Sequence, residues 1–262
     1  MLRALLFFFL LVAAAQAAQM KPEEAVAVQT ALDRGTLLYE VDRAAWVTTD
    51  DMLARLGEEG AAGIRGWTVE PDGALGAFLV TYYGDSPAGP VALYSGKVRD
   101  GKVASSELHP EGARPPLTAL QLRLKQAADT ARAFDEYEPC TPARFNLAVI
   151  PPANAAGPIE AYLLSAQTER GVYPAGGHYR LTIADGKVVS NRRFTKSCLN
   201  LDTTAQGDSG APAALVMSHL LDPTPTEIHV FLSMSAGKPV YVMTGKTLWV
   251  VEGPRIRILN RD

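Results

Sequence analysis

The sequence predicts an α+β protein in which antiparallel sheets are covered on one face by helices. Apolar residues recur at helical spacing in several segments, and they alternate with polar residues in many others. Asp-Gly and Gly-rich turns separate the alternating segments, as expected of hairpins. The 262 residues are 47% hydrophobic and 20% charged, which argues against disorder and supplies a substantial core.

The first 17 residues predict a secretory signal peptide. A basic start at Arg3 precedes an uncharged apolar run, Ala4–Ala14, and then the small-x-small site Ala15-Gln16-Ala17. We expect cleavage after Ala17 and a periplasmic or secreted protein. A membrane anchor is the alternative, but the run is shorter than the roughly 20 residues that span a bilayer. We expect no transmembrane segment after cleavage.

The two cysteines, Cys140 and Cys198, predict one disulfide, because an even pair in an exported protein favours a bridge. Two unpaired buried thiols are the alternative. The chain has no Cys-x-x-Cys pair, which argues against a thiol-redox enzyme or a cysteine zinc site.

A net charge of −3 provides no basic field for phosphate backbones, so we expect no nucleic-acid partner. The sequence contains no phosphate-binding loop or dinucleotide fingerprint, and we assign no cofactor. The partner is an unknown protein or a small ligand.

The first predicted unit, residues 18–112, starts with helices. Pro22 and two following acids suit a helix start, and Gly35 suits its end. Residues 38–46 are ambiguous between strand and helix, and Thr49 resembles the cap of a second helix. Four strands follow: Gly66–Glu70, Ala77–Tyr83, Pro90–Val98 and Lys102–Leu108.

The second predicted unit, residues 113–206, has the same order. A long helix over Leu117–Tyr137 precedes four strands: Arg144–Ile150, Ile159–Ala166, His178–Ile183 and Lys187–Phe194. The hairpin Asp185-Gly186-Lys187-Val188 resembles Asp100-Gly101-Lys102-Val103, 85 residues earlier. We interpret the match as a degenerate duplication; chance recurrence of Asp-Gly turns is the alternative.

The third predicted unit, residues 207–262, is shorter. We expect a helix over Ala211–Leu221 and then four strands: Glu227–Met234, Val240–Thr244, Thr247–Glu252 and Arg255–Leu259. A helix against a four-stranded meander resembles the cystatin-like or PepSY-like architecture of exported bacterial proteins. The segments Leu38–Trp46 and His219–Phe231 are similar to uncharacterised exported proteins of alphaproteobacterial type. That resemblance implies export and no known activity.

The segment Gly207-Asp208-Ser209-Gly210-Ala211-Pro212 resembles the nucleophile loop of trypsin-like serine proteases. In that family the base precedes the serine, so His109 and His178 are the candidates. Neither has the family's context. The alternative is that Asp208 or Ser209 caps the helix expected to follow.

Other residues offer weaker sites. Glu227 and His229 would share one face of the predicted strand, and His219 lies nearby, but no standard zinc spacing is present. Six tyrosines in or beside predicted strands could form a ligand surface or be buried: Tyr82, Tyr83, Tyr94, Tyr162, Tyr173 and Tyr179. We assign no catalytic or metal residue. The favoured interpretation is a non-enzymatic exported binding or interaction protein, and the alternative is a serine hydrolase using Ser209.

Overall fold

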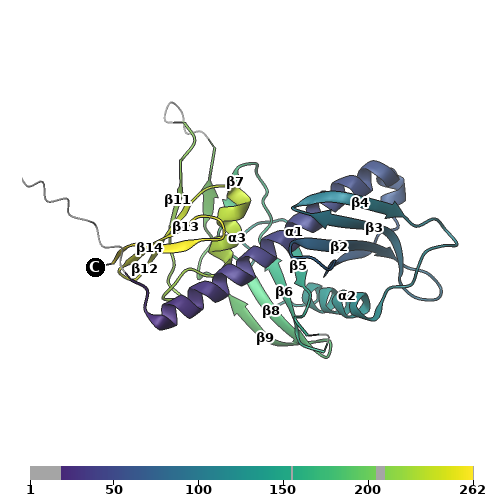
Figure 1. The fold of residues 1–262 in the computed structure, drawn as a ribbon, viewed down its shortest axis with the longest axis horizontal. Helices are drawn as coiled ribbons and strands as arrows, with labels where there is room; N and C mark the ends of the chain where they lie inside the picture. The colour runs from purple at the N-terminus through teal and green to yellow at the C-terminus, as the bar shows by residue number, and fades with distance from the viewer. Residues whose placement is uncertain (1–18, 155, 205–209, 262) are drawn as a thin grey trace, which may run out of the picture.

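The fold is described by a computed structural model that covers residues 19–154, 156–204 and 210–261 (Figure 1). Within these ranges it has three helices, three four-stranded sheets and one two-stranded sheet, which confirms the α+β class. No helix in these ranges has an apolar stretch long enough to cross a membrane. The predicted signal peptide lies outside the described residues.

The helices are α1 (Pro22–Ala61), α2 (Ala119–Arg132) and α3 (Glu227–Ala236). The first sheet has the order β1 (Gly66–Pro71), β2 (Ala77–Gly84), β3 (Val91–Arg99) and β4 (Lys102–Leu108). The second has the order β5 (Asn146–Ile150), β6 (Ile159–Leu164), β8 (Tyr179–Ala184) and β9 (Lys187–Arg193). Both sheets are antiparallel. The short strands β7 (Val172–Pro174) and β10 (Asn200–Asp202) pair with each other. The third sheet contains β11 (Leu215–Ser218), β12 (Val240–Thr244), β13 (Thr247–Val251) and β14 (Ile256–Arg261).

Helix α1 is helical without a break from Pro22 to Leu56, where the sequence predicted separate segments, and a kink at Gly57, which has non-helical backbone angles (φ 66°, ψ 176°), separates its last turn. Gly35 does not end it. A Cβ on Gly35 would lie 2.5 Å from Cβ of Val230, so this glycine allows α1 and α3 to approach closely. At 1.5 Å per residue, the stretch before the kink is about 50 Å long. It runs across the molecule from the third sheet to the first and contacts the second on the way (Figure 1).

The two ends of the described chain are joined through α1. Glu24, in its first turn, accepts a hydrogen bond from the guanidinium of Arg261 in β14 at 2.7 Å, across 237 positions of sequence. Burial acts to raise the pKa of Glu24, but hydrogen bonds from the Lys21 backbone and Arg261 lower it overall.

Helix α2 is shorter than the predicted Leu117–Tyr137. Thr118 begins it with a capping box: its hydroxyl accepts from the backbone N–H of Gln121, and the Gln121 side chain accepts from the backbone N–H of Thr118. The helix packs Leu124, Ala127 and Ala131 against the second sheet.

The Asp-Gly hairpins of the first two sheets have the same geometry. Asp100 and Asp185 have φ of 49° and 50°, and the glycines after them have φ of 67° and 71°. Positive φ at both central residues defines the type I′ turn that suits a two-residue hairpin. Each hairpin also carries a register shift at the same position, two residues before its aspartate.

The second sheet differs from the predicted arrangement, in which helices cover one face of a sheet and solvent contacts the other. In β6, Ile159, Ala161 and Leu163 face the cluster under α2, whereas Tyr162 and Leu164 belong to the larger core with α1 and α3. Both faces of this strand are therefore buried. Repeated cystatin-like units are not confirmed.

The predictions for the start of the third region were wrong. Residues 211–214 are irregular and Leu215–Ser218 form β11, where we expected a helix, and Glu227–Ala236 form α3, where we expected a strand. The alternation from Ile228 to Met234 was misleading because the segment is buried on nearly all sides. Strand β11 is parallel to β12, and a parallel pair needs a crossover, which α3 provides. The last three strands were predicted correctly.

The predicted disulfide between Cys140 and Cys198 is present, with Cα atoms 5.3 Å apart. It joins the segment after α2 to the segment before β10. Gly177 packs against it, since a Cβ there would lie 2.6 Å from Sγ of Cys140. The bridge is compatible with an extracellular or periplasmic protein.

Candidate functional site

A cavity of about 830 Å³ lies where the first and second sheets meet. Strands β1 and β5 are the edge strands of these sheets. They approach within 8 Å between Cα atoms but do not pair, and both α1 and α2 contact both strands. Consecutive residues of each strand line the cavity, so the strand edges themselves form part of its wall. This volume suits a small organic ligand.

Aromatic rings form much of the wall. They come from α1, β1 and the segment between α2 and β5: Trp46, Trp67, Phe134, Tyr137 and Phe145. Trp46 is 56% exposed and Tyr137 is 37% exposed, although both are large rings. Exposed aromatic rings beside a cavity are typical of a binding surface.

Three of these rings are held by neighbouring side chains. The guanidinium of Arg43 lies 4.4 Å from the ring centre of Trp46, one helical turn away. The rings of Tyr137 and Phe145 pack edge to face with centres 4.7 Å apart. The wall is therefore partly organised without a ligand.

One face of α1 lines the cavity. Asp42, Ala45, Trp46 and Thr49 follow the i, i+3, i+4, i+7 spacing of a single helix stripe. The hydroxyl of the buried Tyr82 on β2 fixes this stripe, because it donates to the backbone oxygen of Ala45 at 2.8 Å and bonds the Thr49 hydroxyl at 2.7 Å.

Asp42 is the acidic side chain of this stripe. It is partly buried, and within the described residues its carboxyl group has no hydrogen bond or ion pair. Burial alone raises the pKa of Asp42 to about 6. The carboxylate is therefore mostly charged at neutral pH, but at a cost in free energy that no neighbouring group offsets.

Three guanidinium groups also line the cavity, and two of them are already paired. Arg65 forms an ion pair with Asp85 at 2.9 Å, and Arg132 with Asp129 at 3.2 Å. Arg144 is exposed and has no ion pair within the described residues. The cavity thus has one unpaired carboxyl group on α1 and one unpaired guanidinium on the segment before β5.

The disulfide restrains one wall of the cavity. Cys140 lies between Tyr137 and Phe145 in sequence, in the irregular segment that joins α2 to β5. Its bond to Cys198 ties this segment to the one that follows β9. Nearby, the hydroxyl of Tyr179 accepts from the backbone N–H of Glu138 at 2.9 Å.

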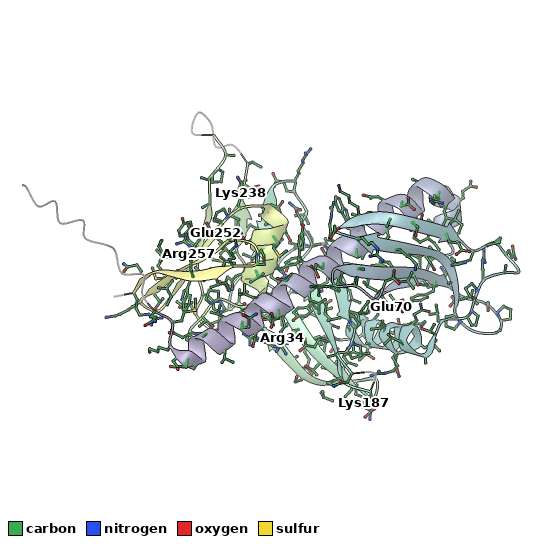
Figure 2. The ribbon with its side chains drawn as sticks, in the orientation of Figure 1. Arg34, Glu70, Lys187, Lys238, Glu252 and Arg257 are labelled. Carbon is green, nitrogen blue, oxygen red and sulfur yellow. A yellow bond between two sulfur atoms is a disulfide. The ribbon has the colours of Figure 1, made fainter. Side chains whose placement is uncertain are left out.

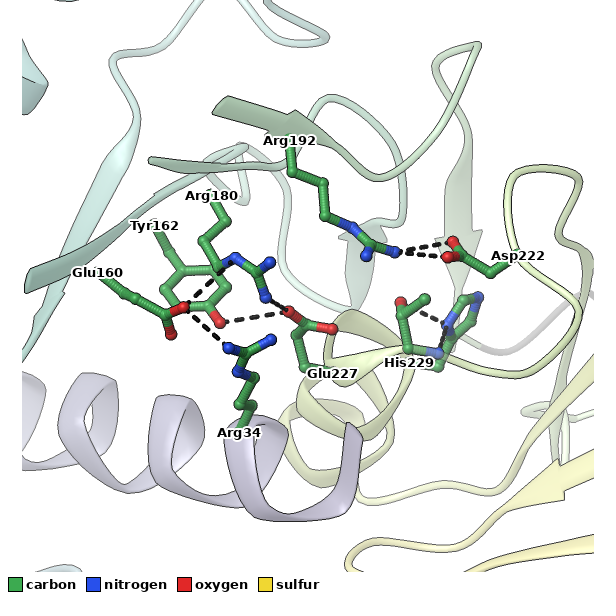
Figure 3. A network of polar contacts seen from close by, with 9 residues as sticks. Arg34, Glu160, Tyr162, Arg180, Arg192, Asp222, Glu227 and His229 are labelled. Carbon is green, nitrogen blue, oxygen red and sulfur yellow. Dashed lines mark hydrogen bonds and ion pairs between the residues drawn. The ribbon is translucent and has the colours of Figure 1, made fainter. Parts of the chain in front are cut away.

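A second polar cluster, which we call the junction network, connects α1, the second sheet and α3 (Figure 3). The carboxylate of Glu227 on α3 pairs with Arg180 on β8 at 2.5 Å and accepts from the hydroxyl of Tyr162 at 3.3 Å. Glu160 on β6 pairs with Arg180 at 3.6 Å and with Arg34 on α1 at 3.1 Å. Arg34 lies about a third of the way along α1 (Figure 2). Every charge here has a partner.

Buried histidines lie beside this network. Asp222 accepts from Arg192 at 2.8 Å and contacts Nε2 of His219 at 2.8 Å; the His219 hydrogen bond is the main reason that the pKa of Asp222 is lowered. The ring of His229 packs edge to face on His219 with centres 4.7 Å apart. Burial, reinforced by the charge of His219, lowers the pKa of His229 to about 3. Glu227 points to Arg180 and Tyr162 instead of these rings, so the residues considered for a metal diverge (Figure 3).

The motif around Ser209 cannot be placed, because Asp208 and Ser209 lie outside the described residues. The helix they were expected to cap does not form. Both ring nitrogens of His178 are engaged with backbone groups, Nδ1 with the N–H of Ser165 and Nε2 with the oxygen of Pro174. Burial lowers the pKa of His178 to about 4. His109, the other candidate base, contacts the hydroxyl of Ser95 at 2.9 Å.

Five of the six tyrosines considered for a ligand surface are buried: Tyr82, Tyr83, Tyr94, Tyr162 and Tyr179. Tyr173 is partly buried. The cavity residues were not singled out from the sequence. The stripe of Asp42, Ala45, Trp46 and Thr49 was the available signal, and it was missed because residues 38–46 were not assigned to a helix.

No model of a known protein family matches this chain, and no curated protein or solved structure shows significant similarity to it.

Proposed function

We propose that this protein binds a small organic ligand with an apolar body in the cavity between its first two sheets. The observation that carries the proposal is the aromatic lining of a cavity of about 830 Å³ that includes the exposed ring of Trp46. Binding, and not catalysis, is favoured because the cavity residues include no nucleophile paired with a base.

Titration with the neutral fluorophore N-phenyl-1-naphthylamine tests this function, because its emission rises in apolar surroundings. We expect saturable binding of one molecule per chain. Ala45→Phe, which places a ring into the cavity from α1, should abolish binding. Val26→Phe adds the same ring to α1 at a position that is 69% exposed and outside the cavity, and it should leave binding unchanged.

Absence of saturable binding to the unmodified protein would contradict the proposed function. So would an Ala45→Phe variant that is folded, by circular dichroism, and still binds the fluorophore with the original affinity.

We also propose that the protein is exported and that its first two sheets derive from a duplicated unit. The disulfide and the predicted signal peptide support export. The shared hairpin conformation and the shared register shifts near Asp100 and Asp185 support duplication. N-terminal sequencing of the mature protein should begin at Ala18, and retention of Met1 would refute cleavage.

Hydrolysis through Ser209 is the alternative function. A fluorophosphonate reagent labels an activated serine stoichiometrically. We expect no labelling, since His178 is buried and both of its ring nitrogens contact backbone groups. Stoichiometric labelling that is lost in Ser209→Ala would favour the hydrolase.

A further inference from the structure

We propose that the ligand of this cavity is an organic amine and that the carboxylate of Asp42 binds its ammonium group. The inference rests on the proposed function and adds the chemical class of the ligand. Three observations carry it: the position of Asp42 in the cavity, the absence of a partner for its carboxyl group, and the aromatic rings beside it.

Asp42 differs from two other acids that α1 directs to the protein interior, Asp51 and Glu24, which have partners. Nine residues further on, Asp51 accepts hydrogen bonds from Tyr94 and Ser106, both at 2.7 Å, and pairs with Arg55 at 3.0 Å. Near the start of the helix, Glu24 is paired with Arg261. Asp42 has no such group within the described residues, although it lines a cavity with room for one.

The cationic side chains near the cavity do not pair with the Asp42 carboxyl group. No lysine, arginine or histidine of the described residues lies within 4.0 Å of the Asp42 carboxyl group. Of the cavity guanidiniums, Arg65 and Arg132 have partners of their own and Arg144 is exposed. A carboxylate held in apolar surroundings lacks the countercharge that would stabilise it. A bound ammonium group supplies that charge.

The surrounding rings favour the same ligand. Trp46 lies one turn of α1 from Asp42, and Trp67 lies in the facing wall on β1. Indole faces attract cations, and aromatic residues beside a carboxylate recognise alkylammonium groups. The remaining aromatic residues, Phe134, Tyr137 and Phe145, offer apolar area for the body of the molecule.

A matched ligand series tests the head group. 4-Phenylbutylamine, 4-phenylbutanol and 4-phenylbutyrate share one apolar body and carry an ammonium, a hydroxyl and a carboxylate. Displacement of N-phenyl-1-naphthylamine gives the affinity of each near neutral pH. We expect the amine to bind about tenfold or more tightly than the alcohol, as a charge-assisted hydrogen bond provides.

Asp42→Asn should remove this preference while the fluorophore still binds, which shows that the variant is folded. Glu40→Gln is the control. Glu40 lies on α1 two residues earlier and outside the cavity, and it also has a raised pKa because of burial. The control should keep the preference for the amine.

The outcomes separate the two proposals. If the fluorophore binds and the amine has no advantage over the alcohol, the amine inference is overturned and the binding function stands. Tighter binding of the carboxylate overturns it in favour of recognition by Arg144. An amine preference that persists in Asp42→Asn also overturns it. If neither the fluorophore nor any of the three compounds binds, both proposals fail.

Discussion

The second sheet contacts α3 at the junction network and the first sheet at the cavity. Charged groups are all paired at the junction, but not at the cavity. At the junction with α3, Glu227 and Tyr162 are buried, Arg180 is partly buried beside them, and each charge is paired (Figure 3). At the cavity, Asp42 is the carboxyl group of a wall that also contains three arginines, and it has no partner within the described residues. Paired buried charges fix the relative position of elements, whereas an unpaired one lowers stability. The junction network is therefore typical of a contact that holds elements together, and the cavity is typical of a ligand-binding site.

The largest expected effect is at the junction. Glu227→Ala should lower the free energy of unfolding by about 3–5 kcal/mol, because it leaves the guanidinium of Arg180 buried with a weaker partner. Urea denaturation followed by circular dichroism measures the loss. Replacing both Arg180 and Glu227 by Met should recover part of it. A loss below about 1 kcal/mol in the single variant would show that the network does not join the elements.

The next effect concerns the wall of the cavity. Replacing Cys140 and Cys198 by Ser opens a loop of 58 residues and should lower stability by about 2–4 kcal/mol. It should also weaken fluorophore binding, since Tyr137 and Phe145 flank Cys140. Thermal denaturation and titration measure the two effects. Unchanged affinity would mean that the bridge does not organise the cavity. As a control, the unmodified protein should have no titratable thiol when denatured without reductant.

Asp42→Asn should change how stability depends on pH. The pKa of Asp42 is raised from 3.8 to about 6 in the folded protein, so the folded state binds this proton more tightly than the unfolded state. Stability from this group is highest below about pH 4, falls as pH rises to about 6, and stays low above that. At roughly 1.4 kcal/mol per pKa unit, the variant should gain up to about 3 kcal/mol on the unmodified protein between acidic and neutral pH.

The difference in stability between Asp42→Asn and the unmodified protein separates the titration of Asp42 from that of the histidines. His178 and His229 have pKa values lowered by burial, so both proteins lose stability as pH falls below about 6.5 and the unfolded chain binds protons. That loss cancels in the difference between variant and parent. A difference that is constant across this pH range would contradict the burial of an unpaired carboxyl group.

The smallest effect on stability is expected at the edge of the cavity. Trp46→Leu removes a ring that is 56% exposed and its contact with Arg43, so the free energy of unfolding should change by no more than about 1 kcal/mol. Fluorophore affinity should nevertheless fall. Denaturation curves and fluorophore titrations of the variant measure the two quantities. A loss of unfolding free energy as large as the loss of binding free energy would assign Trp46 to the core.

Local patterns predicted most of the antiparallel fold. The strands of the first two sheets were found because their turns carry Asp-Gly and their residues alternate, and the disulfide followed from two cysteines in a predicted exported chain. The errors occurred where long-range packing decides the structure. Gly35 resembles a helix end in sequence, but it lies within α1 because Val230, almost 200 residues later, packs against it. The segment from Ile228 to Met234 alternates like a strand, but it is buried all round as a helix.

The cavity could not be predicted for the same reason. Its walls combine α1, β1, α2 and β5, and no short segment records that these elements converge. Asp42 is distinguished by its place on the cavity wall together with the absence of a partner within the described residues, and both are properties of the folded protein and not of the residues near it in sequence.

The bond between Glu24 and Arg261 has a consequence for how the chain folds. The helix that organises all three sheets comes early in the chain, but its partners α3 and β14 come last. Contacts this distant in sequence close slowly, because the loop entropy must be lost before they form. A chain made or threaded from its N-terminus must therefore keep the part of α1 that contacts α3 and β14 uncovered until nearly all of it has emerged. Completion of the fold is thus tied to arrival of the last strand.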